Sequence, residues 1–140
     1  MATLAEEREY LENELRSYRY IVDQCYRWEQ VIVNAEIAIY GVISPHAKDV
    51  IYENAGDPYD CKYTSLYEDI KNAEAQLRLW KPRRIWIESR LGVLTQEEYQ
   101  AIKYYYMLKQ SQDWIADVLQ VGRRTVQRRL DKAIEKMLNL

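Results

Sequence analysis

The sequence predicts an all-α fold, in which a long N-terminal helical hairpin of coiled-coil type precedes a C-terminal helix-turn-helix. Only 4 Gly and 3 Pro interrupt the 140 residues, so long helices meet few breaks. Apolar residues recur at helical spacing over most of the chain. With 48% hydrophobic residues, the chain can form one ordinary domain or two very small ones, which excludes large enzyme folds.

The first predicted helix runs from Leu4 to about Tyr40. Its apolar residues recur every seven positions, which is typical of a coiled coil, and such a stripe must be covered. The cover is either the chain's own second helix or a second copy of the chain, and both apply if two chains form an intertwined bundle. The stripe consists of Leu4, Leu11, Tyr18, Cys25, Ile32 and Ile39, with Leu15, Ile21, Val22, Trp28 and Ala35 beside them.

A connector is expected from about residue 41 to 64, because Gly and Pro turn signals interrupt the helical pattern there. Its acidic residues lack the spacing of an EF-hand calcium loop, so we expect a solvated loop. A second helix, from about Ser65 to Trp80, would lie antiparallel on part of the first. Its buried face would consist of Leu66, Ile70, Ala73, Leu77 and Trp80.

Pro82 is expected to end the second helix or to kink it sharply, because the residue before a proline avoids helical angles. The basic and aromatic stretch that follows predicts a linker helix. This linker lies along a phosphate backbone or a polymerase surface in one interpretation; in the other, its Ile and Trp pack and its charges are solvated. The expected organisation is a packing and oligomerisation region at 1–80, the linker helix at 81–93 and a helix-turn-helix domain at 94–140.

The C-terminal domain opens with a helix that begins at Thr95, where Glu98 completes a capping box. We expect Tyr99, Ile102 and Tyr106 on the inner face of this helix.

A helix from Gln112 to Gln120 follows, with Ser111 as its N-cap. We expect it to pack through one apolar face, formed by Ile115, Val118 and Leu119. Gly122 is expected to supply the backbone angles of a tight junction.

The last helix, from about Arg123 to Leu138, would turn Val126, Leu130 and Ile134 inward. Its exposed side is almost all arginine, with Arg123, Arg124, Gln127, Arg128 and Arg129 around it. Long cationic donors at the N-terminal end of a helix are what a helix in the DNA major groove requires.

DNA binding can be assigned to individual residues of this pair of helices. The first helix would cross the backbone and the second would enter the major groove. The base-contacting candidates are Arg124, Gln127 and Arg128, and the phosphate-contacting candidates are Arg123, Thr125, Arg129 and Lys132, with Lys103 or Lys109 in addition. The alternative is that the arginines only solubilise a helix face.

The last third of the chain resembles sigma factor region 4 and its relatives. The resemblance lies in the opening segment from Leu94 to Tyr99, in Ile115-Ala116 and in Arg124-Thr125-Val126. Gly122 departs from the family, which usually has a Ser or Thr cap there. More loosely, the order of parts along the chain resembles small phage transcription regulators of the RinA and ArpU type. These resemblances imply double-stranded DNA as a partner and a possible contact with RNA polymerase.

Composition limits the other functions. Two cysteines and one histidine make neither a disulfide framework nor a zinc site, so no metal or cofactor is expected. His46 lies in a turn region without a catalytic arrangement around it, and an enzyme is not expected. No signal peptide or membrane span is evident, which favours the cytoplasm of a bacterial host cell and no membrane partner.

The charges divide unevenly along the chain, with 5 Lys or Arg against 12 Asp or Glu in residues 1–60 and 15 against 10 in residues 61–140. Such asymmetry suggests different partners for the two halves. The main hypothesis is a sequence-specific transcription regulator, an activator of phage late genes that acts as a homodimer through its N-terminal helix. The alternatives are a DNA-packaging protein of the small-terminase kind, which would form a ring, and a helical protein-binding adaptor, whose activity would survive charge reversal at Arg124 and Arg128.

Overall fold

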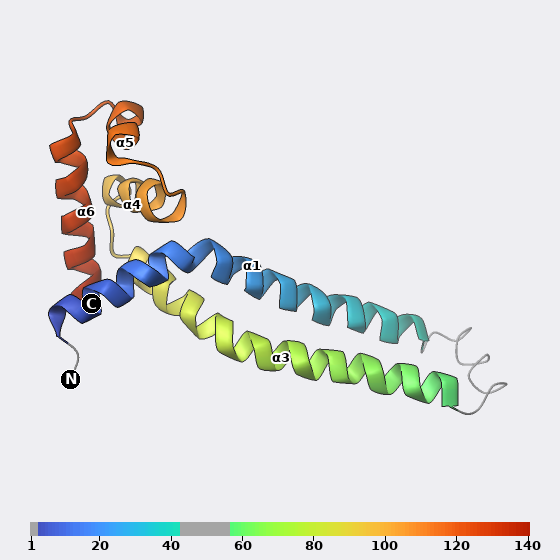
Figure 1. Cartoon of the computed structure of the whole chain (residues 1–140). Helices are drawn as coiled ribbons and strands as arrows, with labels where there is room; N and C mark the ends of the chain where they lie inside the picture. The colour runs from blue at the N-terminus through green and yellow to red at the C-terminus, as the bar shows by residue number, and fades with distance from the viewer. Residues whose placement is uncertain (1–2, 43–56) are drawn as a thin grey trace. The chain divides into compact units, whose positions relative to one another are not determined.

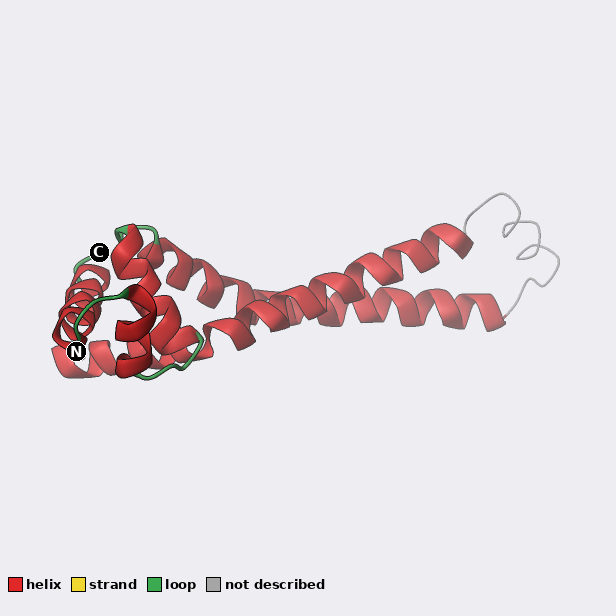
Figure 2. Cartoon of the chain, turned by 90° about the horizontal axis from the view of Figure 1, so that it is seen from above, coloured by secondary structure: helices red, strands yellow, loops and turns green. Residues whose placement is uncertain are grey.

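The computed structural model describes residues 3–42 and 57–140, and side chains within 3–40 and 64–140. Every regular element in these ranges is helical, which confirms the all-α fold (Figures 1 and 2). The elements are α1 (Leu4–Val42), α3 (Asp57–Leu91), α4 (Gln96–Ile102), the π-helix η1 (Lys103–Met107), α5 (Gln112–Leu119) and α6 (Arg123–Leu138). None of the described helices combines the length and the apolar character needed to cross a membrane.

The bounds of the long helices agree with the sequence at α1 but differ at α3. The second helix was expected at about Ser65 to Trp80, and α3 extends beyond this range at both ends. The prediction that Pro82 ends the helix is wrong, because Pro82 lies inside α3. Most of the predicted connector, including His46, lies outside the described residues, as does the side chain of Cys61.

The chain divides into two units, and both long helices contribute to each. The first unit comprises Met1–Val22 and Pro82–Leu140, and the second comprises Asp23–Lys81. The first unit therefore contains α4, η1, α5 and α6 together with the first turns of α1 and the last turns of α3.

The first unit has an apolar core to which each of its helices contributes. Its buried apolar residues are Leu11, Leu15, Ile21, Ile87, Leu91, Ala101, Ile102, Tyr106, Met107, Ile115, Ala116, Val126, Leu130, Ala133, Ile134 and Met137. The predicted inward positions of the last helix are thus confirmed. Because these residues come from both ends of the chain, the core joins α1 to the C-terminal helices.

Polar pairs hold the ends of the long helices together in this unit. Arg83 donates from Nη2 and Nε to the two carboxylate oxygens of the buried Glu14, at 2.6 and 3.1 Å. A two-pronged pair of this kind fixes orientation as well as distance. Tyr18 donates a hydrogen bond to Glu88 at 2.8 Å. Burial raises the pKa of Tyr18 to about 12, and this hydrogen bond is the second cause of the rise. These contacts place tertiary constraints on α3 just after Pro82, which helps to explain why the helix continues through it.

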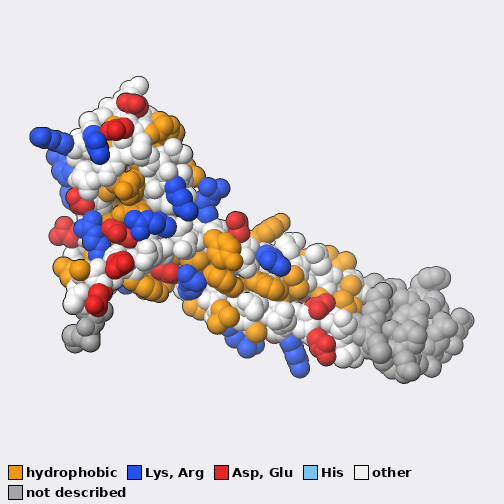
Figure 3. All heavy atoms as spheres, viewed as in Figure 1, with side chains coloured by type: hydrophobic (Ala, Val, Ile, Leu, Met, Phe, Trp, Pro, Cys, Tyr) orange, Lys and Arg blue, Asp and Glu red, His pale blue; other side chains and the backbone are white. Residues whose placement is uncertain are grey.

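The second unit is a pair of helical segments, one from α1 and one from α3, which run side by side in opposite directions (Figures 1 and 2). Cys25, Ala35 and Ala73 are its buried apolar residues among those described. Figure 3 shows a band of hydrophobic side chains along these segments on the visible face. Four large apolar side chains of α1 are exposed in this unit, namely Tyr26, Val33, Ile37 and Tyr40.

Candidate nucleic-acid interface

The C-terminal helices α4 and α5 begin at local caps that the sequence predicts. Thr95 and Glu98 form the expected capping box, and Ser111 accepts a hydrogen bond from the Trp114 backbone N–H at 3.1 Å. Each cap satisfies backbone donors that a helix start otherwise leaves unpaired. These caps fix where α4 and α5 begin.

The turn between α5 and α6 differs from its predicted geometry. The residue with positive φ is Gln120, at 56°, whereas Gly122 has an ordinary φ of −75° and is the N-cap of α6. The expectation that Gly122 supplies unusual backbone angles is therefore wrong. Since glycine has no side chain, it provides no capping hydrogen bond at the start of α6.

Two of the predicted inward positions are exposed. Val118 was expected on the apolar face of α5, but it is 45% exposed, and Ala116 is buried beside Ile115 instead. Tyr99 was expected on the inner face of α4 and is 38% exposed, while the neighbouring Glu98 is buried. The other predicted inward residues Ile102, Tyr106 and Ile115 are buried, so the predicted faces are correct in part.

Glu98 occupies its buried position with a charged partner, because Lys136 of α6 donates to its carboxylate at 2.7 Å. Burial alone would favour the neutral acid, but hydrogen bonds from Lys136 and Thr95 outweigh it and lower the pKa of Glu98. This pair ties the start of α4 to the last turns of α6. The packing of α4 thereby helps to hold α6 in place.

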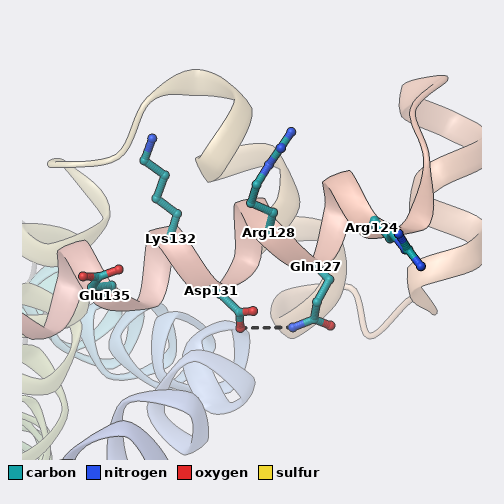
Figure 4. A pocket seen from close by; sticks show the side chains of 6 residues that line it. All are labelled: Arg124, Gln127, Arg128, Asp131, Lys132 and Glu135. Carbon is teal, nitrogen blue, oxygen red and sulfur yellow. Dashed lines mark hydrogen bonds between the residues drawn. The ribbon is translucent and has the colours of Figure 1, made fainter.

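The outer face of α6 consists of six side chains around an open hollow, Arg124, Gln127, Arg128, Asp131, Lys132 and Glu135 (Figure 4). Arg128 and Lys132 extend to one side of the helix, and Gln127 and Asp131 to the other. The base-contacting candidates Arg124, Gln127 and Arg128 are all exposed and lie together on this face. Asp131 and Glu135 make the face acidic in part, so its basic character belongs to the first turns of α6.

The phosphate-contacting candidates differ in their surroundings. Lys132 is exposed on the outer face, and Thr125 is half-buried. Arg123 lies 3.6 Å from Asp113, with both side chains exposed. Arg129 lies 3.5 Å from Glu97 and is only 21% exposed. A surface ion pair is easily exchanged for another partner, so Arg123 remains available to an anion, whereas Arg129 is the least accessible of the three cationic candidates.

Sequence reasoning missed the polar residues that contact this face from other helices. Gln112 of α5 donates to Gln127, and Arg8 of α1 donates to Asp131 at 3.1 Å. Asp131 stands four residues after Gln127, a spacing at which helical side chains meet, so that contact was predictable. No sequence signal connects Arg8 with a residue 123 positions away.

Residues 90–137, which span the end of α3 and nearly all of α4 to α6, match the model of the family Sigma-70, region 4. This is a helix-turn-helix domain of the DNA-binding kind and not a catalytic fold. The match confirms the resemblance to sigma region 4. No curated protein and no solved structure matches the chain. The described residues contain no cluster of His, Cys, Asp or Glu suited to hold a metal ion.

Proposed function

We propose that this protein is a sequence-specific DNA-binding transcription regulator that reads the major groove with α6. The observation that carries the proposal is the outer face of α6, where Arg124, Gln127 and Arg128 are exposed together within a region 4 domain. Arginine pairs with guanine edges and glutamine with adenine edges in the major groove. Arg123, Thr125, Arg129 and Lys132 are the proposed phosphate contacts, with Arg129 the weakest candidate.

In this proposal, the protein activates phage late genes in the cytoplasm of a bacterial host and has RNA polymerase as a second partner. Support for this role comes from the order of parts along the chain and from the region 4 domain. A module of this size buries little surface on DNA, so specific regulation needs a second module or a second protein.

The second module is proposed to be a second copy of the chain, bound through α1. Tyr26, Val33 and Tyr40 are exposed at seven-residue spacing, and Ile37 lies on the same side of the helix. The buried residues of α1 are covered within the chain, and this exposed stripe is a surface available for self-association. A dimer would present two recognition helices to two half-sites.

DNA titration tests the function directly. The wild type and an Arg124→Ala, Arg128→Ala double variant are titrated against the gene's flanking intergenic DNA and a scrambled duplex. We expect the wild type to prefer the native DNA and the variant to lose about 1 to 3 kcal/mol of binding free energy per base contact. An Arg19→Ala, Arg78→Ala variant removes the same charge from two exposed positions outside α6 and should keep the preference. Equal binding of the wild type to both duplexes at moderate salt contradicts the proposal.

Scattering mass tests the dimer. A Val33→Glu, Ile37→Glu variant should be a monomer where the wild type is a dimer, because carboxylates in an apolar contact lose hydration without gaining a partner. Asn34→Glu, at an exposed position of the same helix, is the control and should leave the mass unchanged. A wild-type monomer contradicts self-association, and a ring of many subunits favours DNA packaging over regulation.

A further inference from the structure

A chain of four polar contacts connects the first turns of α1 to the outer face of α6. Arg8 donates from Nε to Glu12 and from Nη2 to Asp131, both at 3.1 Å. Gln127 donates from Nε2 to the same Asp131 oxygen at 3.0 Å, and Gln112 donates to Gln127 Oε1 at 2.5 Å. All five residues belong to the first unit. A residue near the N-terminus is thus two hydrogen bonds away from a proposed base contact.

Asp131 is the unfavourable member of the outer face for DNA binding. Its carboxylate shares the face with Arg124 and Arg128 and would repel phosphates if it were left alone. Arg8 supplies a compensating charge from another helix. The side chains of the pair are 44% and 50% exposed, so the contact adds little to the stability of the fold. Its main effect is on the charge and geometry of the outer face.

Gln127 is the proposed base-contacting residue whose side-chain orientation depends on these polar contacts. Its amide nitrogen donates one hydrogen to Asp131, and its amide oxygen accepts one bond from Gln112. A glutamine amide has a second hydrogen and a second acceptor position. One donor and one acceptor therefore remain, and a glutamine uses one donor and one acceptor on the N7 and N6 atoms of adenine. The two contacts restrict the orientation of the Gln127 side chain without using all of its hydrogen-bonding groups.

We propose that Arg8 is a positioning residue for DNA recognition, which neutralises Asp131 and, through it, holds Gln127 ready to read adenine. The inference rests on the proposed function and adds the N-terminal helix to the determinants of sequence preference. A direct contact between Arg8 and a phosphate is the competing explanation, and it predicts a different dependence on Asp131.

A double-mutant cycle on the full chain separates these explanations. Wild type, Arg8→Ala, Asp131→Asn and the double variant are titrated against the preferred duplex and the scrambled duplex. We expect Arg8→Ala to reduce the ratio of the two affinities by about threefold to tenfold. In the Asp131→Asn background the same change should have no effect, because the asparagine oxygen still accepts from Gln127 and carries no charge to neutralise. The thermal midpoint should stay within the range of the control.

The control is Arg19→Ala, which removes the same charge from an exposed position about three turns further along α1. It should leave the affinity ratio unchanged. An equal loss for Arg8→Ala in both backgrounds overturns the inference in favour of a direct contact, and no loss in either background overturns it altogether. A wild type without preference between the two duplexes overturns the proposed function itself, so the two failures are distinguishable within one experiment.

Discussion

The two units of the molecule bury their apolar side chains to different degrees. In the first unit large residues such as Leu11, Ile102 and Met137 are fully enclosed, and they come from several helices. In the second unit the buried apolar residues among those described are small, namely Cys25, Ala35 and Ala73. A fully buried side chain needs about 6 to 12 neighbouring residues, which two helices alone seldom provide. The first unit therefore has a core of large side chains, whereas the described large apolar side chains of the second unit are all half-buried or exposed.

This difference suits the two units to different roles in the proposed regulator. The first unit combines α1, α3 and the helix-turn-helix in one core, so its stability and the position of α6 depend on each other. The second unit has exposed Tyr, Val and Ile side chains that a partner can cover. In the proposed regulator, the first unit reads DNA and the second brings two copies together.

The largest expected effect contrasts one isoleucine from each unit. Ile134 is 1% exposed in α6, and Ile37 is 64% exposed in α1. Replacing Ile134 by Ala should reduce the free energy of unfolding by about 2 to 5 kcal/mol, because the substitution leaves a cavity in the core. Ile37→Ala should change it by less than about 0.5 kcal/mol in the monomer. Urea denaturation followed by circular dichroism measures both, and the intrinsic helix preference of the substitution cancels in the comparison.

Protein concentration sharpens this contrast. If a second copy covers Ile37, the effect of Ile37→Ala on unfolding should grow with protein concentration, because the dimer stabilises the folded state by mass action. The effect of Ile134→Ala should show no such growth. Equal effects of the two substitutions at low concentration would break the comparison between the units.

A smaller effect concerns the buried carboxylates. Among the described residues these are Glu14 and Glu98, and both belong to the first unit. The pKa of Glu98 is lowered in the folded state, so its stabilisation is complete above the ordinary value near 4.5 and is lost as the pH falls through the folded value. Glu98→Gln should cost about 1 to 2 kcal/mol at neutral pH and less in acid. Unfolding measured from pH 7 to pH 3 tests this. Glu74→Gln, at an exposed position of the second unit, should give a curve parallel to the wild type.

The sequence predicted those parts of the fold that depend on neighbouring residues. The capping box at Thr95, the Ser111 cap and the bounds of α6 all rest on signals within a few positions, and the structure has them. Pro82 shows the limit of this reasoning. A proline disfavours the helix locally, but packing and the Glu14–Arg83 pair involve residues far away in the sequence and outweigh its cost.

The candidate site shows the same limit. The exposed arginines of α6 follow from the position of Val126, Leu130 and Ile134, because the opposite face of a helix is fixed once one face is buried. What meets that face from another helix is not fixed by spacing. The contact between Arg8 and Asp131 depends on how α1 packs in the first unit, so it could only come from the structure.

The smallest expected effect lies within the helix-turn-helix, where two helix starts differ in their caps. Ser111 accepts a hydrogen bond from Trp114 N, whereas Gly122 offers no side chain to the start of α6. A Cβ atom at Gly122 would meet nothing within 4 Å, and its φ of −75° suits any residue. Gly122→Ser should therefore stabilise the first unit by a few tenths of a kcal/mol, and Ser111→Gly should destabilise it by a similar amount. Thermal midpoints shifted by about 1 °C in opposite directions would show that the start of α6 lacks only a cap. A lower midpoint for Gly122→Ser would mean instead that the turn from Gln120 to Gly122 depends on the freedom of glycine, despite the ordinary angles of Gly122.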